Sequence, residues 1–142
     1  MVQDEHLAST AKKLLPDCSR ILVFEENDNV LYSSFEADVR ELETLKQTFT
    51  DRDEAIKAGL NLQGRRFEVH RYHPPLAYGR SMDTAPETSE GCAICQIDQG
   101  PSGDTAFAVI TYEMPNISAR MVSQLVLFCK ESLGLKASIS AQ

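Results

Sequence analysis

The spacing of apolar residues changes at Gly59. Before this glycine, apolar side chains recur every three or four residues over 7–15 and again over 37–49, which is the spacing of an amphipathic helix. After it, residues 65–72 alternate between apolar and polar, which is the period of a half-exposed strand. This switch, with helical spacing again near the end of the chain, predicts an α+β fold with an antiparallel sheet.

Turn residues between the apolar segments indicate how the elements connect. Asn and Asp separate 21–25 from 30–33, and because both tolerate positive φ, these segments are expected to pair as a hairpin. Gly59 suits the end of a helix, and an acidic loop is expected over 81–90. The predicted helices cover 7–15, 37–49, 55–58 and 121–133, and the predicted strands cover 21–25, 30–33, 60–62, 65–72, 76–79, 92–97 and 106–112.

Length and charge restrict the classes of function. The chain has 142 residues, enough for one domain with a continuous apolar core. Its formal net charge is −7, which disfavours broad contact with the phosphates of nucleic acids. The charge is uneven, since 64–82 carries 4 basic residues and 1 acidic residue, whereas 83–113 carries 6 acidic residues and no basic one. The basic segment either attracts an acidic partner or forms a solvated strand face.

The sequence predicts neither a membrane span nor a secretory signal. The longest apolar runs, such as 21–24 and 107–110, are about four residues long, whereas a spanning helix needs roughly 20. Asp4 and Glu5 stand where a signal would carry basic residues, so a cytoplasmic, reducing location is expected. In that setting the cysteines are expected to be small buried side chains rather than disulfide partners. They are Cys18, Cys92, Cys95 and Cys129.

No motif predicts catalysis or a metal site. Cys92 and Cys95 have the spacing of half a zinc site, but on a strand they point to opposite faces, and a second pair of ligands is missing. His70 and His73 are also three residues apart on one strand and have no accompanying carboxylate pair. Neither a G-x-S-x-G turn nor a phosphate-binding G-x-x-x-x-G-K-[ST] loop occurs. We therefore expect a binding protein without cofactor or metal, not an enzyme.

Three segments of the chain resemble motifs of profilins. Residues 58–71, AGLNLQGRRFEVHR, resemble the profilin pattern G-L-x-L-x-G-x-[KR]-[YF]-x-V-x-R. Residues 78–80 resemble its [YR]-G-[KR] turn, and 110–113 resemble the strand before its last helix. The resemblance covers about two thirds of the chain, from 37 to 134. It implies a profilin-like α+β fold, in which the N- and C-terminal helices lie on one face of the antiparallel sheet and shorter helices lie on the other.

The resemblance also implies partners. Profilins are cytoplasmic proteins of the actin cytoskeleton that bind monomeric actin on a strand pair and the start of the last helix. They also bind proline-rich peptides between the first and last helices, and phosphoinositides on basic patches. Carried over by position, the actin-binding residues are Arg66, Arg71, Arg80, Arg120, Ser123 and Gln124. The poly-proline face carried over in the same way consists of His6, Leu7, Leu31, Leu127 and Cys129.

The chain departs from the profilin pattern where proline-rich ligands would bind. It contains no Trp, and His6, Leu7 and Leu31 stand where the family has aromatic residues. Because polyproline II ligands dock on flat aromatic faces, binding of proline-rich ligands is expected to be weak or absent. The loop at 115–118 also differs from the Gly-containing loop of the family, so actin binding is expected to be weak. These departures resemble the fourth profilin group of vertebrates, whose members are more lipid-associated than actin-directed.

Two alternatives remain open from the sequence. One is a divergent profilin that acts mainly through acidic phospholipids or other protein partners. The other is a longin- or roadblock-like trafficking adaptor, whose architecture has similar periodicities but does not explain the glycines and arginines of 59–71. In each case we expect a monomer with a single domain over 1–142 and a disordered tail over 135–142.

Overall fold

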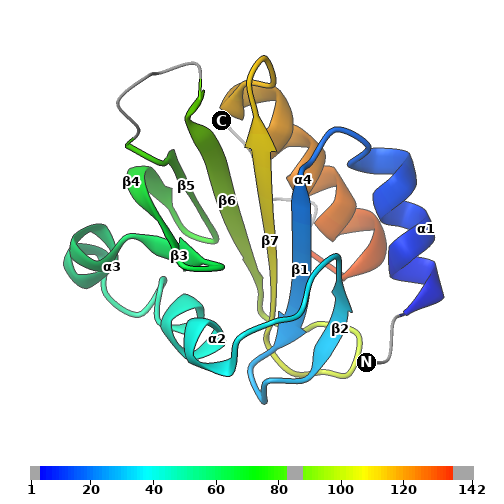
Figure 1. The fold of residues 1–142 in the computed structure, drawn as a ribbon. Helices are drawn as coiled ribbons and strands as arrows, with labels where there is room; N and C mark the ends of the chain where they lie inside the picture. The colour runs from blue at the N-terminus through cyan, green and yellow to red at the C-terminus, as the bar shows by residue number, and fades with distance from the viewer. Residues whose placement is uncertain (1–3, 83–87, 136–142) are drawn as a thin grey trace.

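The computed structural model describes residues 4–82 and 88–135, which form one curled antiparallel sheet with helices on both faces (Figure 1). The seven strands follow the order β2-β1-β7-β6-β5-β4-β3. The helices are α1 (Glu5–Leu14), α2 (Val39–Lys46), α3 (Arg52–Ala58) and α4 (Ser118–Ser132). The strands are β1 (Arg20–Glu25), β2 (Val30–Ser33), β3 (Leu60–Leu62), β4 (Arg65–His73), β5 (Leu76–Arg80), β6 (Glu90–Ile97) and β7 (Ala106–Glu113). The predicted α+β class is confirmed.

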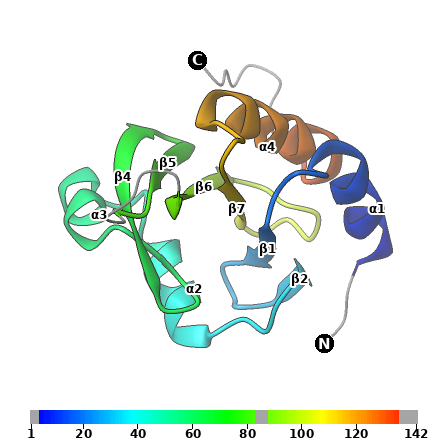
Figure 2. The same cartoon turned by 45° about the horizontal axis from the view of Figure 1, so that its top comes forward.

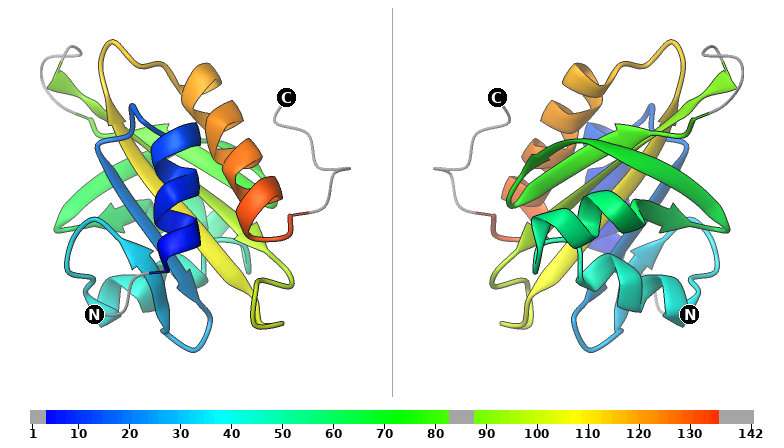
Figure 3. Two further views of the ribbon diagram at one scale, coloured as in Figure 1. Left: turned by 90° about the vertical axis from the view of Figure 1, so that its right-hand side faces the viewer. Right: turned by 90° about the vertical axis from the view of Figure 1, so that its left-hand side faces the viewer.

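The two faces of the sheet carry different helices. Helices α1 and α4 lie side by side on one face and run in opposite directions (Figure 3, left). Helices α2 and α3 lie on the other side of the sheet, as the view from above and the opposite side view show (Figures 2 and 3). This arrangement confirms the prediction that the terminal helices share one face and the shorter helices the other.

Each face of the sheet buries its own apolar core. The α1/α4 core lies under the terminal helices, and the α2/α3 core lies under the short helices and β3. Alternation along the strands divides residues between them, so that Cys95 belongs to the first core and Cys92 to the second. The largest fully buried side chains of the first core are Tyr112, Phe128, Leu7 and Ile97. Those of the second core are Phe24, Phe67, Leu22, Leu42, Leu45, Leu60, Leu62 and Ile94.

Aspartate side chains begin three of the helices. Asp4, Asp38 and Asp51 each accept a hydrogen bond from a backbone N–H in the first turn, at 3.1, 2.9 and 3.1 Å. Such bonds satisfy donors that have no partner within the helix. Gly59 ends α3 at a φ of 71°, a left-handed backbone that suits glycine, and it leads directly into β3. The sequence correctly predicted this helix end.

Strand β4 contains a bulge. Val69 pairs with Gly79 of β5, but the next paired residue is Arg71, which lies opposite Tyr78. His70 is therefore the extra residue of β4 in this pairing. Gly79 permits the close approach of the two strands, because a Cβ at this position would lie 1.6 Å from a carbonyl oxygen of β4.

The bulge changes which side chains share a face. Strict alternation predicted that His70 follows Arg66 and Glu68 on one face of the strand. The bulge adds Arg71 to that face, because the count of residues shifts by one after Val69.

Several predicted boundaries also differ from the structure. Helix α2 ends at Lys46, so Phe49 packs against the α2/α3 core from the turn that follows it. Helix α4 begins at Ser118, three residues earlier than predicted. Glu90 opens β6 instead of closing a loop, and Leu135, assigned to the disordered tail, is buried in the α1/α4 core. The rest of the predicted tail, and 83–87 of the predicted acidic loop, lie outside the described residues. No helix within the described ranges is long and apolar enough to span a membrane.

A buried carboxylate joins distant strands across the α2/α3 side of the sheet. Glu90 of β6 accepts hydrogen bonds from Arg20 of β1 at 2.6 Å and from Arg65 of β4 at 3.0 Å. Arg20 also donates to Thr111 of β7 at 3.2 Å and to Gln63 beside β3 at 2.7 Å. We call Arg20, Glu90 and Arg65 the ionic clamp. It connects strands that are four places apart in the sheet and so stabilises its curl.

Candidate functional site

Arg66, Arg71 and Arg80 lie on one face of the β4–β5 hairpin. Glu68 of β4 pairs with Arg80 of β5, and residues paired across antiparallel strands project to the same side. Arg66 lies two residues before Glu68 and shares its face, and the bulge adds Arg71. This side of the sheet also carries α1 and α4, since Tyr78, the partner of Arg71, packs against the α1/α4 core. We call Arg66, Glu68, Arg71 and Arg80 the arginine face.

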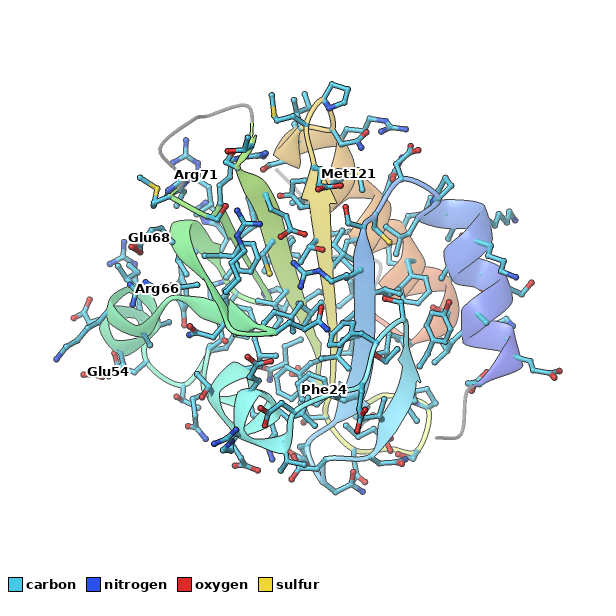
Figure 4. The ribbon with its side chains drawn as sticks, in the orientation of Figure 1. Phe24, Glu54, Arg66, Glu68, Arg71 and Met121 are labelled. Carbon is cyan, nitrogen blue, oxygen red and sulfur yellow. The ribbon has the colours of Figure 1, made fainter. Side chains whose placement is uncertain are left out.

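The arginines differ in what they already bind. Arg66 donates to the carboxylate of Glu68 at 3.0 Å and to the carbonyl of Lys57 at 2.9 Å. Arg71 is exposed, and within the described residues its guanidinium bonds only the carbonyl of His70, at 3.4 Å. Figure 4 shows Arg66, Glu68 and Arg71 along the outside of β4. Within the described residues, Arg71 is therefore the cation of this face whose guanidinium bonds no other side chain, so a partner's carboxylate can reach it without displacing one.

Arg80 is held by its neighbours. Its guanidinium donates to the hydroxyl and the carbonyl of Ser89, at 3.0 and 3.2 Å, and lies 5.8 Å from the centre of the Tyr112 ring. Tyr112 in turn donates to the hydroxyl of Ser118 at 2.8 Å, and burial raises the pKa of this phenol to about 12. Gly91 leaves room for the ring, because a Cβ there would lie 2.1 Å from it. These contacts connect the arginine face to the start of α4.

The predicted residues of α4 do not join the arginine face as a group. Arg120 pairs with Asp17 and donates to the side-chain oxygen of Asn116 at 2.9 Å, so it is tied to the connection between α1 and β1. Gln124 lies four residues later on the same side of the helix and is partly buried. Ser123 is exposed, and its hydroxyl donates to the backbone of its own helix at 3.0 Å. The sequence placed Arg120, Ser123 and Gln124 near the start of α4, but it did not predict which residues they contact.

The loop between β7 and α4 exposes large apolar side chains that sequence reasoning missed. Met114 is 47% exposed and Ile117 is 55% exposed, and Pro115 between them is exposed as well. Met82, just beyond β5, is 71% exposed at the same end of the sheet. We call residues 113–117 the apolar loop. Two large apolar residues and a proline in the four residues between β7 and α4 were a signal that the sequence offered, since connections lie at the surface.

The predicted poly-proline face is only partly at the surface. Leu7 is 1% exposed and Cys129 is 0% exposed, so both belong to the α1/α4 core and cannot contact a ligand. His6 is exposed, Leu31 is partly buried, and Leu127 is 46% exposed. Helical spacing explains the correction: the side of each helix that faces the sheet is buried whether or not the family places an aromatic residue there.

The cysteines form no shared ligand set. Cys92 and Cys95 lie in opposite cores, as the alternation of a strand predicts, so one ion cannot reach both thiols. Cys129 lies in the same core as Cys95, and Cys18 is partly buried. Burial raises the pKa of Cys18 to about 11 and raises the pKa of Cys92 and of Cys129 as well. Within 4–82 and 88–135 no group of three or more His, Cys, Asp or Glu residues is arranged to hold a metal ion.

Comparisons with known proteins identify the fold. No protein-family model and no curated protein sequence matches the chain. Among solved structures, the profilin of Schizosaccharomyces pombe matches with a TM-score of 0.70 and 16% identity, over 88% of this chain and 94% of that one. Profilin IA of Acanthamoeba castellanii matches with a TM-score of 0.69 and 13% identity, over 88% and 94%. LokiProfilin1, in a complex with rabbit actin, matches with a TM-score of 0.69 and 14% identity, over 90% and 94%. The described chain therefore has the profilin fold.

Proposed function

We propose that the chain is a divergent profilin that binds monomeric actin and regulates actin cytoskeleton dynamics in the cytoplasm, acting as a monomer. The observation that carries this proposal is the arginine face with Arg71, which has no ion-pair partner among the described residues, on a chain that has the profilin fold over most of its length. Two proteins of the same fold, LokiProfilin1 and LokiProfilin2, form complexes with rabbit actin. The motif at 58–71 supports the same assignment.

The chemistry of the arginine face fits an acidic protein surface. A guanidinium can form two parallel hydrogen bonds with one carboxylate, and Arg71 is exposed and free to do so. Arg66 and Arg80 have partners within this chain, so they add positive charge without being free ligands. We therefore assign the main charge contact to Arg71. Because Arg71 is the one arginine of this face without a side-chain partner among the described residues, the interface is expected to be weak.

Titration of purified actin monomers tests the proposed function. We expect saturable binding, and we expect Arg71→Glu to reduce affinity roughly 30-fold or more, because losing one partner of a desolvated charge pair costs about 2 to 5 kcal/mol. Lys13→Glu on α1 is the matched control, since it makes the same change of charge at another exposed residue. The proposal fails when the wild-type protein, at high concentration, alters neither polymerisation nor nucleotide exchange of actin.

Weak or absent binding of proline-rich ligands is the second part of the proposal. The described surface between α1 and α4 offers His6, Leu31 and Leu127 from the predicted face, and the whole chain contains no Trp. Aliphatic side chains bury apolar area but have no flat ring and no N–H or O–H for the carbonyls of a polyproline II ligand.

Binding to acidic phospholipids is a second candidate function. The observation that favours it is the charge of 64–82, which has 4 basic residues and 1 acidic residue in a chain whose net charge is −7. Co-sedimentation with vesicles of neutral lipid, with and without an acidic phospholipid, tests it. Binding that needs the acidic lipid and is lost in Arg71→Glu supports this function. The alternative of a longin- or roadblock-like adaptor has no observation in its favour beyond the order of elements.

A further inference from the structure

We propose that a cavity between the β4–β5 turn and the end of α4 binds a small organic cation, an amine carried on an apolar body. The cavity has a volume of about 780 Å³, and small-molecule sites occupy about 300 to 1,000 Å³. Its lining joins the ring of Phe49, the turn at 74–75, the end of β6 with the residues that follow it (96–99), and 134–135 after α4. The end of α4 and the connection after β6 lie side by side (Figure 3, left). We call this site the amine cavity.

The amine cavity lies at the other end of β5 and β6 from Arg80. Arg80 pairs with Gly91 at one end of these strands, whereas Leu76 pairs with Cys95 at the other end, next to the turn at 74–75. None of the described residues that line the cavity belongs to the arginine face. The cavity is thus separate from the contacts proposed for actin, and the inference does not rest on the proposed function.

The charges around the amine cavity favour a cation. Among the described residues that line it, Asp98 is the one that carries a charge, and its exposed carboxylate forms no ion pair within the described part of the chain. Helix α4 ends at the cavity, and a helix C-terminus carries partial negative charge because its last carbonyls have no partners within the helix. Lys130, the basic residue in the last turn of α4, does not line the cavity. The carboxylate and the helix end therefore both attract an ammonium group.

The ring of Phe49 supplies an aromatic wall for the ligand. Phe49 is partly buried, and its ring centre lies 5.7 Å from that of Tyr72, whose hydroxyl donates to the carbonyl of Thr48 at 2.9 Å. These contacts hold the ring in place before a ligand binds. The face of an aromatic ring attracts a cation, and the two proline rings at 74–75 add apolar surface. The body of the ligand is therefore expected to be apolar and its charged group to be positive.

The walls of the amine cavity are tied together by hydrogen bonds. The backbone N–H of Gln96 donates to the carbonyl of Pro75 at 2.9 Å, which joins β6 to the β4–β5 turn. The carbonyl of Asp98 accepts from the hydroxyl of Thr105 at 3.3 Å, which fixes the connection after β6. The side-chain amides of Gln96 and Gln99 offer carbonyl oxygens that can accept from an ammonium group. A cavity that is already formed costs little to order when a ligand binds.

Three probes with the same apolar body and different charged groups test the inference. They are phenethylamine, phenethyl alcohol and hydrocinnamate, which carry an ammonium, a hydroxyl and a carboxylate. The measurement is a titration of the full chain, followed by its amide chemical shifts. We expect phenethylamine to shift the amides of 96–99 and 134–135 saturably and to bind about threefold more tightly than the alcohol, the effect of a charge pair that stays in contact with water. Hydrocinnamate is expected to bind most weakly, because its carboxylate is repelled.

Two variants and one matched control assign the contacts. Asp98→Asn keeps the shape of the side chain and is expected to weaken binding of phenethylamine about threefold, without changing binding of phenethyl alcohol. Asp104→Asn is the control, since it removes an exposed carboxylate from the same connection but does not line the cavity, and it is expected to bind as wild type. Phe49→Leu is expected to weaken binding of the amine more than binding of the alcohol, because the ring that attracts the cation is lost. Amide spectra of the variants without ligand establish that they are folded.

Three outcomes overturn the inference. The first is the absence of saturable shifts with phenethylamine. The second is equal affinity for the amine and the alcohol, which makes the cavity an apolar site without charge selection. The third is an equal loss in Asp98→Asn and Asp104→Asn, which makes the preference for the amine a consequence of the net charge of −7. Binding of the amine that is weakened in Asp98→Asn and not in Asp104→Asn supports the inference, whether or not the chain binds actin.

Discussion

Glu90 illustrates how one residue can hold distant parts of this sheet together. Its carboxylate is 7% exposed and binds Arg20, which is 21% exposed, and Arg65, which is 38% exposed. A carboxylate between two guanidiniums neutralises part of their positive charge. Because the Glu90 carboxylate is buried, its loss would leave the two arginines with little solvent to screen their repulsion. The exposed pair of Arg66 and Glu68 has a similar distance, 3.0 Å, but solvent weakens it.

Glu90→Gln is therefore expected to destabilise the fold by about 2 to 3 kcal/mol, because Arg20 and Arg65 then face each other without a counter-charge. Glu68→Gln is the matched control and is expected to cost less than about 1 kcal/mol, since its ion pair is exposed. Urea unfolding of both variants measures the difference. Equal free energies of unfolding contradict a structural role for the ionic clamp.

At the scale of elements, α1 and α4 pack as in the profilin fold, but the residues predicted to face a proline-rich ligand are not aromatic. The two helices pack side by side on the sheet, as the profilin fold requires (Figure 3, left). Of the residues predicted to face a proline-rich ligand, Leu7 and Cys129 are buried, and Leu127 is the most exposed apolar one. The helices therefore retain their packing function without an aromatic surface from the predicted set.

A deca-proline peptide is expected to bind poorly or not at all. The reason is that aliphatic side chains bury proline rings, at about 25 cal/mol per Å², without the stacking and hydrogen bonds of Trp and Tyr. Amide chemical shifts of α1 and α4, followed during a titration, are the measurement. Saturable binding below 1 mM (about 4 kcal/mol) that is centred on these helices contradicts the expectation.

At the scale of the whole molecule, burial controls the reactivity of the cysteines. Cys92, Cys95 and Cys129 are buried on the two sides of the sheet, and Cys18 is partly buried. Burial disfavours the thiolate, and it raises the pKa of Cys18 to about 11. Because the thiolate is the reactive form, a raised pKa lowers the rate of reaction at neutral pH.

Cysteine labelling with a disulfide reagent is expected to be slow in the folded protein. At pH 8 the thiolate fraction of Cys18 is expected to be about 100-fold below that of a thiol with the ordinary pKa of 9.0, and the labelling rate is expected to rise with pH until about 11. Unfolding in urea is expected to expose all four thiols at once. Rapid labelling of the native protein at pH 8 contradicts this picture of burial.

The order and type of the elements could be predicted from the sequence because they depend on local patterns. Helical spacing before Gly59 and alternation after it were sufficient for the α+β class, and Gly59 itself ends α3. The placement of the terminal helices was implied by the order of the elements and by the resemblance of 58–71 to a profilin motif. The position of Arg66 on the outside of β4 followed from alternation alone, since it lies before the bulge.

Contacts between residues far apart in the chain decided which charged side chains are bound within the molecule and which lie on the arginine face. Arg120 is bound by Asp17, which lies 103 residues earlier, and Glu90 is bound by Arg20, which lies 70 residues earlier. Arg71 reached the arginine face only through the bulge, which depends on how β4 pairs with β5. No local pattern encodes such pairings, because their free energy comes from burial and charge that arise only when the strands and helices are assembled.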